Sequence, residues 1–432
     1  MKSALLFLVF FFSINIFSQE LTHSQFIKTC GIPWQIRTAK DATPPQGNFT
    51  VPAEFDPAEG IIVCWDWTHS KLQKEIIKFI ATDTKVFVCG SVDAVKKELT
   101  DFGVNMANVR IFNLQLSIWV RDFGPWWIIP ENGGREKVLL EAQYGPVQEL
   151  ADKFPGKNHL SGFYDNGGNM MFDGRGTAVC SAYYDKPEKL EEVRSVYRDY
   201  FGAGQLIFLK KLLKENTGHV DLYCKFLGRN TILLGEYRNA QDGVPGNKEI
   251  LDEDYQTLTA AKNLSGEPYR VERIPMPKYG NNNGDIVNFS YLNSLIVNRK
   301  VLVPIYNIGT DQEALEIYRR LMPGYEVAGF NCRQIIELEG AIHCITIGVY
   351  SDPLKVILEF AKMAGDPLKL HVYSSSPLTR AFACYQVSGY FHQTPLSLDN
   401  GSYTFPLPQH CGLNHCNFVF QDSEGRTRII TP

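Results

Sequence analysis

Two hydrophobic patterns alternate along most of the chain. In the first, apolar residues recur at offsets of three or four, which is the stripe of an amphipathic helix. In the second, a short apolar run follows the stripe, as in a buried strand. The stripes are Leu72, Ile76, Phe79 and Ile80; Val193, Tyr197, Tyr200 and Phe201; a segment around Asp254–Leu264; and Ala314, Ile317, Tyr318 and Leu321. The strands that follow them are expected at Lys85–Cys89, Gln205–Leu209, Tyr269–Ile274 and Tyr325–Phe330. This order of elements predicts an α/β fold.

The spacing of these strands indicates a repeat. They begin at residues 85, 205, 269 and 325, so the first interval is about twice as long as each of the others. A further helix–strand unit is therefore expected between Asp101 and Asp165. Five units of about 60 residues would fill Val51 to Pro353 and share one core. An ordinary doubly wound sheet is the alternative.

The pattern changes after Gly365, where short apolar runs follow one another without an intervening helical stripe. Turn formers separate them, which is typical of a small immunoglobulin-like β-sandwich. The expected strands are Lys369–Ser375, Ala381–Val387, Ser402–Leu407, Asn417–Gln421 and Thr427–Ile430. We therefore expect an α/β domain at 51–364 and the β-sandwich at 365–432, with an extended arm at 19–50 before them.

The first residues have the layout of a secretory signal peptide. A short basic start precedes the apolar segment Ala4–Phe17, and small Ser18 is followed by polar residues. The apolar segment is shorter than the roughly 20 residues that a spanning helix needs, and no later segment reaches that length. We expect residues 1–18 to be removed and the mature protein to be secreted or periplasmic, without a stable membrane anchor.

Charge and cysteine usage narrow the possible partners. The 43 basic and 47 acidic residues give a net charge of -4, whereas proteins that bind nucleic acid usually carry a basic excess. The ten cysteines include no Cys-x-x-Cys pair and the histidines are scattered, so no zinc site is predicted. Cys411 and Cys416 are close enough for a local disulfide. Most of the other cysteines lie in apolar runs, as buried thiols do.

Four short segments place reactive side chains at the ends of strand-like runs. The first contains Arg121 and Asp122 between bulky aromatic residues that include Trp119, and an exposed ion pair is the structural alternative. In the second segment, His219 and Asp221 would share one face of an extended strand. A structural histidine is the commoner outcome for such a pair.

The other two segments complete a chemical set. One places Asn293 and Ser294 ahead of an apolar run, which a turn explains equally well. The other contains Cys344, which taken alone is one buried thiol among ten. Together the four segments offer a thiol nucleophile, a histidine to move protons and two carboxylates. Two carboxylates beside a nucleophile suit a planar, cationic guanidinium, whose N–H groups pair with them.

This ordered set of motifs resembles the agmatine deiminases and the porphyromonad-type peptidylarginine deiminases of bacteria. The matching segments are Trp-Val-Arg-Asp-x-Gly-Pro from Trp119, Gly-Gly-Asn at Gly167–Asn169, Gly-His-Val-Asp from Gly218, Asn293 with Ser294, and Ile-His-Cys-Ile-Thr around Cys344. The resemblance covers roughly Val51 to Ser351. It implies the five-bladed α/β propeller of the guanidino-group-modifying superfamily, which would use no metal and no other cofactor.

The resemblance also implies a role for each residue. Cys344 would be the nucleophile that attacks the guanidinium carbon, and Asp122 and Asp221 would bind the guanidinium nitrogens. His219 would protonate the departing ammonia and then activate water against the thiouronium intermediate. The remaining residues of the pocket would be Asn293 and, beside the stem of the substrate, Trp119.

Three functions are compatible with these patterns. The export pattern and the C-terminal strands favour an exported hydrolase that converts peptidyl-arginine to peptidyl-citrulline and ammonia, with arginine-containing peptides or proteins as partners. The motifs around His219 and Cys344 resemble those of agmatine deiminases, which give N-carbamoylputrescine. A non-catalytic exported protein that binds guanidinium groups is the third.

One stretch departs from the peptidyl enzymes. Their loop after the first aspartate carries arginines that bind the carboxylate of a C-terminal arginine, whereas Glu141–Pro155 contains no arginine here and only one basic residue, Lys153. A preference for C-terminal arginine is therefore not expected unless Arg175 or Arg238 replaces them.

Overall fold

The computed structural model describes residues 43–140, 147–163, 166–182, 187–278, 280–282, 285–351, 356–361, 368–374, 378–387, 390–399, 402–406, 408, 411, 415–422 and 427–430. The signal peptide expected at 1–18 and the arm up to residue 42 lie outside these ranges, so both stay predictions. Within the ranges, no helix combines the length and the apolar character needed to cross a membrane.

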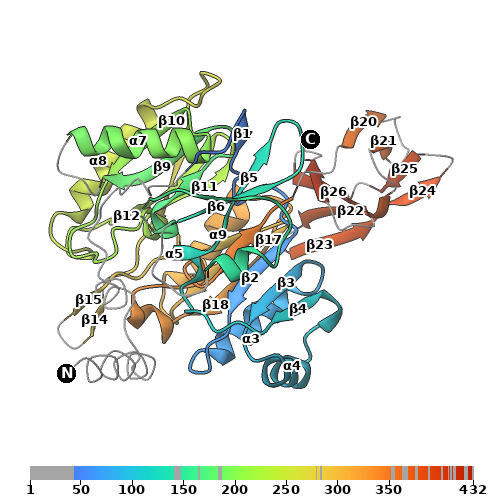
Figure 1. The fold of residues 1–432 in the computed structure, drawn as a ribbon, viewed down its shortest axis with the longest axis horizontal. Coiled ribbons are helices and arrows are strands. Elements are labelled where there is room, and N and C mark those ends of the chain that lie inside the picture. The colour runs from blue at the N-terminus through green and yellow to red at the C-terminus, as the bar shows by residue number, and fades with distance from the viewer. Residues whose placement is uncertain are drawn as a thin grey trace, which may run out of the picture.

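Five small sheets with one shared strand pattern form the larger part of the described chain (Figure 1). In each sheet an antiparallel pair of strands is extended by a parallel strand. The first sheet has the order β19 (Ile347–Val349), β2 (Gly60–Cys64), β3 (Lys85–Cys89), β4 (Val109–Phe112), and the second β1 (Phe49–Thr50), β5 (Trp126–Pro130), β6 (Glu136–Leu139), β7 (Asn158–Leu160). The other three are β8 (Met171–Phe172), β9 (Thr177–Ala182), β10 (Gln205–Lys210); β11 (Cys224–Gly228), β12 (Thr231–Glu236), β13 (Arg270–Pro275); and β16 (Leu295–Val297), β17 (Lys300–Ile305), β18 (Glu326–Asn331).

The second sheet is the unit expected between Asp101 and Asp165, so the prediction of a hidden repeat is confirmed. The alternative of one doubly wound sheet is wrong for the described strands, because they pair within separate sheets. Closure of the five sheets into a propeller stays a prediction.

A helix joins the antiparallel pair to the parallel strand in every unit, as the crossover between parallel strands requires. These helices are α3 (Ser70–Ile80), α6 (Val147–Ala151), α7 (Pro187–Phe201), α8 (Asn247–Ala260) and α9 (Asp311–Leu321), and α4 (Val92–Asp101) precedes the extra strand β4. Helix α3 buries Leu72, Ile76 and Ile80, as its stripe predicts. The helix expected at Asp254–Leu264 begins and ends earlier. It stops because the side chain of Asn263 accepts hydrogen bonds from two backbone N–H groups beyond it, which makes a turn.

The C-terminal residues form two four-stranded antiparallel sheets. One has the order β20 (Val356–Ala361), β21 (Leu368–Ser374), β25 (Ser402–Phe405), β24 (Ser397–Asp399), and the other β23 (Tyr390–Pro395), β22 (Leu378–Val387), β26 (Cys416–Asp422), β27 (Thr427–Ile430). The two sheets share a buried cluster that includes Leu370, Tyr385, Phe405 and Phe418. Their immunoglobulin-like type stays a prediction.

Two details of this C-terminal part differ from the sequence-based expectation. Strand β20 lies before the boundary predicted between residues 364 and 365, yet it pairs with β21. The sulfur atoms of Cys411 and Cys416 lie 3.6 Å apart and are not bonded, so the local disulfide is not formed.

Arg299 fastens the antiparallel sheets to the larger α/β part. This buried side chain forms an ion pair with Asp83, and it also lies 3.3 Å from Gln393 Oε1 on β23. Its guanidinium covers the ring of Phe382 on β22 at 4.3 Å. Figure 1 shows β20–β26 to one side of the α/β part, and Arg299 contacts both parts.

Replacing Arg299 by Met is expected to lower the free energy of unfolding by about 3 kcal/mol, because the buried Asp83 keeps only Lys300 as a cationic partner and the contacts of the guanidinium with β22 and β23 are lost. Urea denaturation of the full chain measures this loss. Arg198→Met is the control, since Arg198 pairs with Asp199 at the surface, where a salt bridge contributes about 0–1 kcal/mol. Equal effects of the two substitutions would contradict the role of Arg299 at the junction.

Candidate active site

The candidate residues come from one recurring position in the fold. Each of the five small sheets has a central strand with one antiparallel and one parallel neighbour, and the candidate residues lie two to four positions before the antiparallel neighbour. Asp122 precedes β5, Asp221 precedes β11, Asn293 precedes β16 and Cys344 precedes β19. The Gly167–Asn169 segment holds the same position before β8. The repeat therefore brings five loops that are distant in sequence to one place.

Asn293 shapes the loop that carries Cys344. Its side-chain Oδ1 accepts hydrogen bonds from the backbone N–H of Ala341 at 3.0 Å and of Cys344 at 3.4 Å. Its Nδ2 donates to the sulfur of Cys344 at 3.2 Å, and its backbone oxygen accepts from the N–H of His343 at 3.1 Å. The polar Asn-Ser pair is thus more than a turn, because its amide fixes the position of the thiol.

His219 and Asp221 converge with Cys344, although by a route that differs from the predicted strand. His219 is the extended residue before the short 3-10 helix η3 (Val220–Leu222), which contains Asp221. A ring nitrogen of His219, a carboxylate oxygen of Asp221 and the sulfur of Cys344 nevertheless all lie within 4.8 Å of one another. The shared space was predicted correctly, and the strand was wrong.

Asp122 and its neighbours lie against the same loop. Asp122 is fully buried in the short helix α5 (Val120–Phe123), and Arg121 is buried beside it, so the alternative of an exposed ion pair is wrong. The backbone N–H of Arg121 donates to the carbonyl of Cys344 at 3.2 Å. Trp119 packs on Gly340 so closely that a Cβ at residue 340 would overlap the indole ring and lie 3.1 Å from the Cβ of Cys344.

The two glycines of the Gly-Gly-Asn motif leave room for the neighbouring loops. A Cβ on Gly168 would overlap the ring of His219, and a Cβ on Gly167 would overlap the backbone oxygen of Arg121. Asn169 binds the backbone N–H of Ser181 at 2.8 Å and thereby joins the motif to β9. The two glycines let the loops of His219 and Arg121 approach each other.

The protonation states follow from burial and from neighbouring charges. Burial, with the charges of Asp221 and Asp122, raises the pKa of Cys344 well above the usual range of a thiol. Burial alone would also raise the pKa of Asp221. The hydrogen bond and charge of His343, together with the charges of His219 and Arg121, lower that pKa overall. The pocket therefore holds a neutral thiol beside an ionised carboxylate.

One oxygen of that carboxylate is available to a ligand. Asp221 Oδ2 binds His343 at 2.6 Å, whereas Asp221 Oδ1 is buried and has no hydrogen-bond partner among the described residues. A buried carboxylate oxygen without a donor is unfavourable, and an N–H group of a cationic ligand would satisfy it. His219, Asp221 and Cys344 are also residue types that bind metals; the absence of a metal site stays a prediction.

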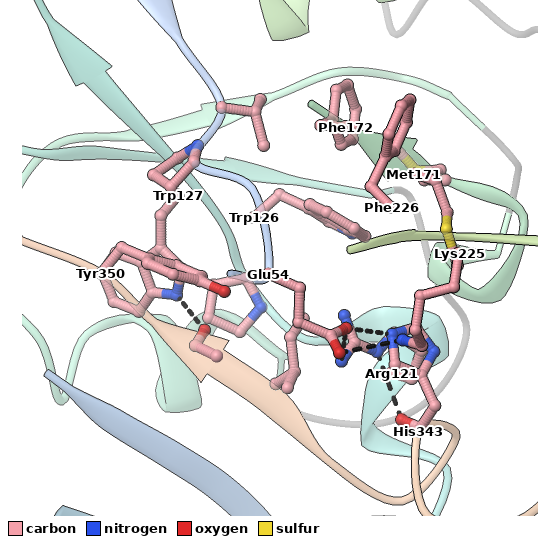
Figure 2. A pocket seen from close by; sticks show the side chains of 16 residues that line it. Glu54, Arg121, Trp126, Trp127, Met171, Phe172, Lys225, Phe226, His343 and Tyr350 are labelled. Atoms are coloured by element: carbon pink, nitrogen blue, oxygen red, sulfur yellow. Dashed lines mark hydrogen bonds and ion pairs between the residues drawn. The ribbon is translucent and has the colours of Figure 1, made fainter. Parts of the chain in front are cut away.

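Four charged residues beside the site line the pocket drawn in Figure 2: Glu54, Arg121, Lys225 and His343. Sequence reasoning singled out Arg121 together with Asp122, but it gave no role to any of the four. Figure 2 shows the carboxylate of Glu54 facing the nitrogen atoms of the other three. Lys225 donates to Glu54 at 2.9 Å, His343 contacts it at 2.5 Å, and Arg121 lies 3.6 Å from it. His343 could have been noticed as the neighbour of Cys344, but no local pattern marks Glu54 or Lys225.

This fold, with a thiol, a histidine and two carboxylates buried together at the strand ends, is that of the deiminases, hydrolases that act on the C–N bond of a guanidino group. More specifically, the chain belongs to the Porphyromonas-type peptidyl-arginine deiminase family, whose model matches residues 50–349. The family predicted from the ordered motifs is therefore confirmed. The matched residues end before strands β20–β27.

Relatives and a solved structure agree with this assignment. The chain is 26% identical over 366 residues to the agmatine deiminase of Stutzerimonas stutzeri, which covers 72% of this chain and 97% of that protein. It is 24% identical over 368 residues to the agmatine deiminase of Pseudomonas syringae pv. tomato, with the same two coverages. The structure of the agmatine deiminase of Enterococcus faecalis has a TM-score of 0.63 at 22% identity, covers 73% of this chain and 99% of that one, and supports the fold.

Because its pKa is raised, Cys344 is expected to react slowly with iodoacetamide near pH 7.5, and the rate should keep rising with pH beyond the range of a free thiol. Asp122→Asn removes one of the negative charges that cause the shift. It should accelerate alkylation at pH 8 by about three- to tenfold, since one pKa unit is a factor of ten in thiolate. Peptide mapping of residue 344 by mass spectrometry measures the rate.

Asp101→Asn is the control for this experiment, because Asp101 is an exposed carboxylate on α4. It should leave the alkylation rate of Cys344 unchanged. An unchanged rate in Asp122→Asn as well would mean that Asp122 does not act on the thiol.

Proposed function

We propose that the protein is an exported deiminase that converts arginine side chains of peptides or proteins to citrulline and releases ammonia. The observation that carries the chemistry is the convergence of Cys344, His219 and Asp221, with a carboxylate oxygen of Asp221 left for an N–H donor. The name of the matching family, the signal-peptide pattern at 1–18 and the additional antiparallel sheets support the peptidyl substrate and the export.

Binding begins with the cation. The guanidinium of the substrate lies between Asp122 and Asp221, and one of its N–H groups donates to Oδ1 of Asp221. The apolar stem packs beside Trp119. Because both carboxylates raise the pKa of Cys344, a bound positive charge offsets their effect and favours the thiolate. The nucleophile is therefore formed when the substrate is present.

The reaction then proceeds in two halves. His219 takes the proton of the Cys344 thiol, and the thiolate attacks the guanidinium carbon. The C–N bond to one terminal nitrogen breaks as His219 gives that nitrogen the proton, and ammonia leaves. A thiouronium remains on the sulfur. His219 next takes a proton from water, and the resulting hydroxide attacks the same carbon. The C–S bond then breaks, the proton of the new hydroxyl group passes to the sulfur, and the ureido product and the neutral thiol are formed, while His219 gives its proton to the solvent.

Hydrolysis of agmatine to N-carbamoylputrescine is the second candidate, and the names of the two curated relatives favour it.

The surroundings of Arg238 and Arg175 argue against a specialised preference for C-terminal arginine. Arg238, one possible substitute for the missing loop arginines, binds Glu313 through both terminal nitrogens and lies 3.2 Å from Glu236. Arg175, the other, lies near Asp56, whose pKa is raised by burial and whose negative charge Arg175 partly stabilises. We therefore propose internal as well as terminal arginines as substrates.

The choice between substrates has a direct test. Purified mature protein is incubated separately with a peptide that contains an internal arginine and with agmatine, and the ureido product is measured colorimetrically. We expect product from the peptide, with a higher kcat/KM than for agmatine. Product from agmatine alone would refute the peptidyl function and establish the second candidate. Ligand binding without any product would support the non-catalytic alternative.

Replacing Cys344 by Ala is expected to abolish turnover, by at least about a thousandfold, because the covalent step has no other nucleophile. The circular dichroism spectrum should be retained, since the side chain is small. Cys89→Ala is the matched control: Cys89 is an equally buried thiol on β3, and its loss should leave kcat unchanged. Ammonia release by Cys344→Ala at the wild-type rate would show that the nucleophile is misassigned.

A further inference from the structure

We propose that His343 is a positioning residue for Asp221: it binds one carboxylate oxygen of Asp221 so that the other faces the substrate, and Glu54 fixes its opposite end. This inference rests on the proposed role of Asp221 as a ligand of the guanidinium. It assigns a function to a residue next to the nucleophile and to a glutamate about 290 positions away in the chain.

The ring of His343 is held from both sides. Its Nδ1 lies 2.6 Å from Oδ2 of Asp221, and its Nε2 lies 2.5 Å from Oε2 of Glu54. The side chain is only 2% exposed, so no bulk solvent competes for either contact. Figure 2 shows His343 beside the carboxylate of Glu54, which its Nε2 contacts.

Both ring nitrogens face carboxylate oxygens. An ionised carboxylate can only accept hydrogen bonds, and the surroundings keep both carboxylates ionised. Burial alone would raise the pKa of Glu54, but Lys225, His343 and Arg121 lower it well below its usual range. The pKa of Asp221 is lowered as well. A ring whose two nitrogens each contact a carboxylate has one favourable orientation, since flipping it would break both contacts.

The backbone of His343 and its glutamate anchor are fixed too. The N–H of His343 donates to the backbone oxygen of Asn293 at 3.1 Å, and its carbonyl accepts from Arg121 Nε at 3.2 Å. Glu54 uses its other oxygen to accept from Lys225 at 2.9 Å and from the N–H of Ile296 at 2.6 Å. The chain of contacts from Lys225 through Glu54 and His343 to Asp221 therefore ends in a rigid carboxylate.

This arrangement separates the tasks of the two histidines. His343 has both nitrogens engaged by protein carboxylates, so it has no site left to exchange a proton with a reactant. His219 lies with a ring nitrogen within 4.8 Å of the sulfur. Without the donor from His343, Asp221 could rotate, and either of its oxygens could turn away from the substrate. Second contacts that orient a binding group commonly change affinity or activity by about 10- to 100-fold.

Two substitutions at residue 343 separate orientation from simple loss of the ring. The amide nitrogen of Asn reaches about the place of Nδ1, so His343→Asn keeps the donor to Asp221. The amide nitrogen of Gln reaches about the place of Nε2, so His343→Gln keeps only the contact with Glu54. Activity is measured with the guanidino substrate that the wild type hydrolyses. We expect kcat/KM to fall by no more than about tenfold in His343→Asn. In His343→Gln it should fall by about a hundredfold or more, with a raised KM.

A histidine of the same kind elsewhere provides the control. His159 is buried in the second sheet and lies 2.5 Å from Glu136, but it has no contact with Asp221 among the described residues. Both His159→Gln and His343→Gln are expected to lower the melting temperature. His159→Gln should leave KM and kcat of the folded protein unchanged. Comparison of the two separates lost stability from lost orientation.

Binding gives a readout that does not need turnover. Calorimetric titration of agmatine and of an arginine peptide into the His343 variants, each in a Cys344→Ala background, should show weaker binding in His343→Gln than in His343→Asn. Equal losses in both, or values within threefold of the parent in both, would overturn the proposal. Failure of the proposed function is a different result: wild-type protein would then form no ureido product, while the binding comparison would still test His343.

Discussion

A buried negative charge beside a thiol is the constraint on which the site depends. Asp221 is fully enclosed, and an enclosed carboxylate persists only where donors and positive charges compensate for the lost water. His343 compensates one of its oxygens, and a cationic substrate would compensate the other. Burial and the same negative charge keep the sulfur of Cys344 neutral. In the proposed mechanism, substrate recognition and activation of the nucleophile are thus two consequences of one electrostatic arrangement.

The repeated architecture explains how such an arrangement can be assembled from distant segments. In each unit, a loop leads into the strand that pairs antiparallel with the central strand of the sheet. The end of that loop carries Asp122, the Gly167–Asn169 turn, Asp221, Asn293 or Cys344. These residues lie within two to four positions of a strand, and hydrogen bonds such as those from the backbone of Ala341 and Cys344 to Asn293 fix the loops further. Rigid strand ends favour the preorganised geometry that binding a planar cation requires. The repeat therefore positions the residues of the site as well as forming the core.

The parts of this picture that sequence could supply are those that depend on local pattern. Helix α3 follows from its apolar stripe, and strands β3 and β10 follow from their short apolar segments. The spacing of the strands predicted a further helix–strand unit, which the second sheet contains. His219 and Asp221 were paired correctly but on the wrong element, because a two-residue offset cannot distinguish a strand from a 3-10 turn. Glu54 and Lys225 were missed for a different reason. An ion pair between residues 171 positions apart is decided by the fold, and nothing near either residue in the chain indicates its partner.

Burial and neighbouring charges also account for how the thiol can be protected and yet available. Lys225, His343 and Arg121 lower the pKa of Glu54 against the effect of its burial, whereas burial and the charges of Asp221 and Asp122 hold the pKa of the Cys344 thiol well above its usual range. Thiolates are the form that oxidants and alkylating agents attack. In the oxidising compartment to which the proposed export would deliver the protein, a permanently ionised cysteine would be lost. A thiol that ionises only when a guanidinium neutralises its two carboxylate neighbours meets both demands, because the same charge that identifies the substrate generates the nucleophile.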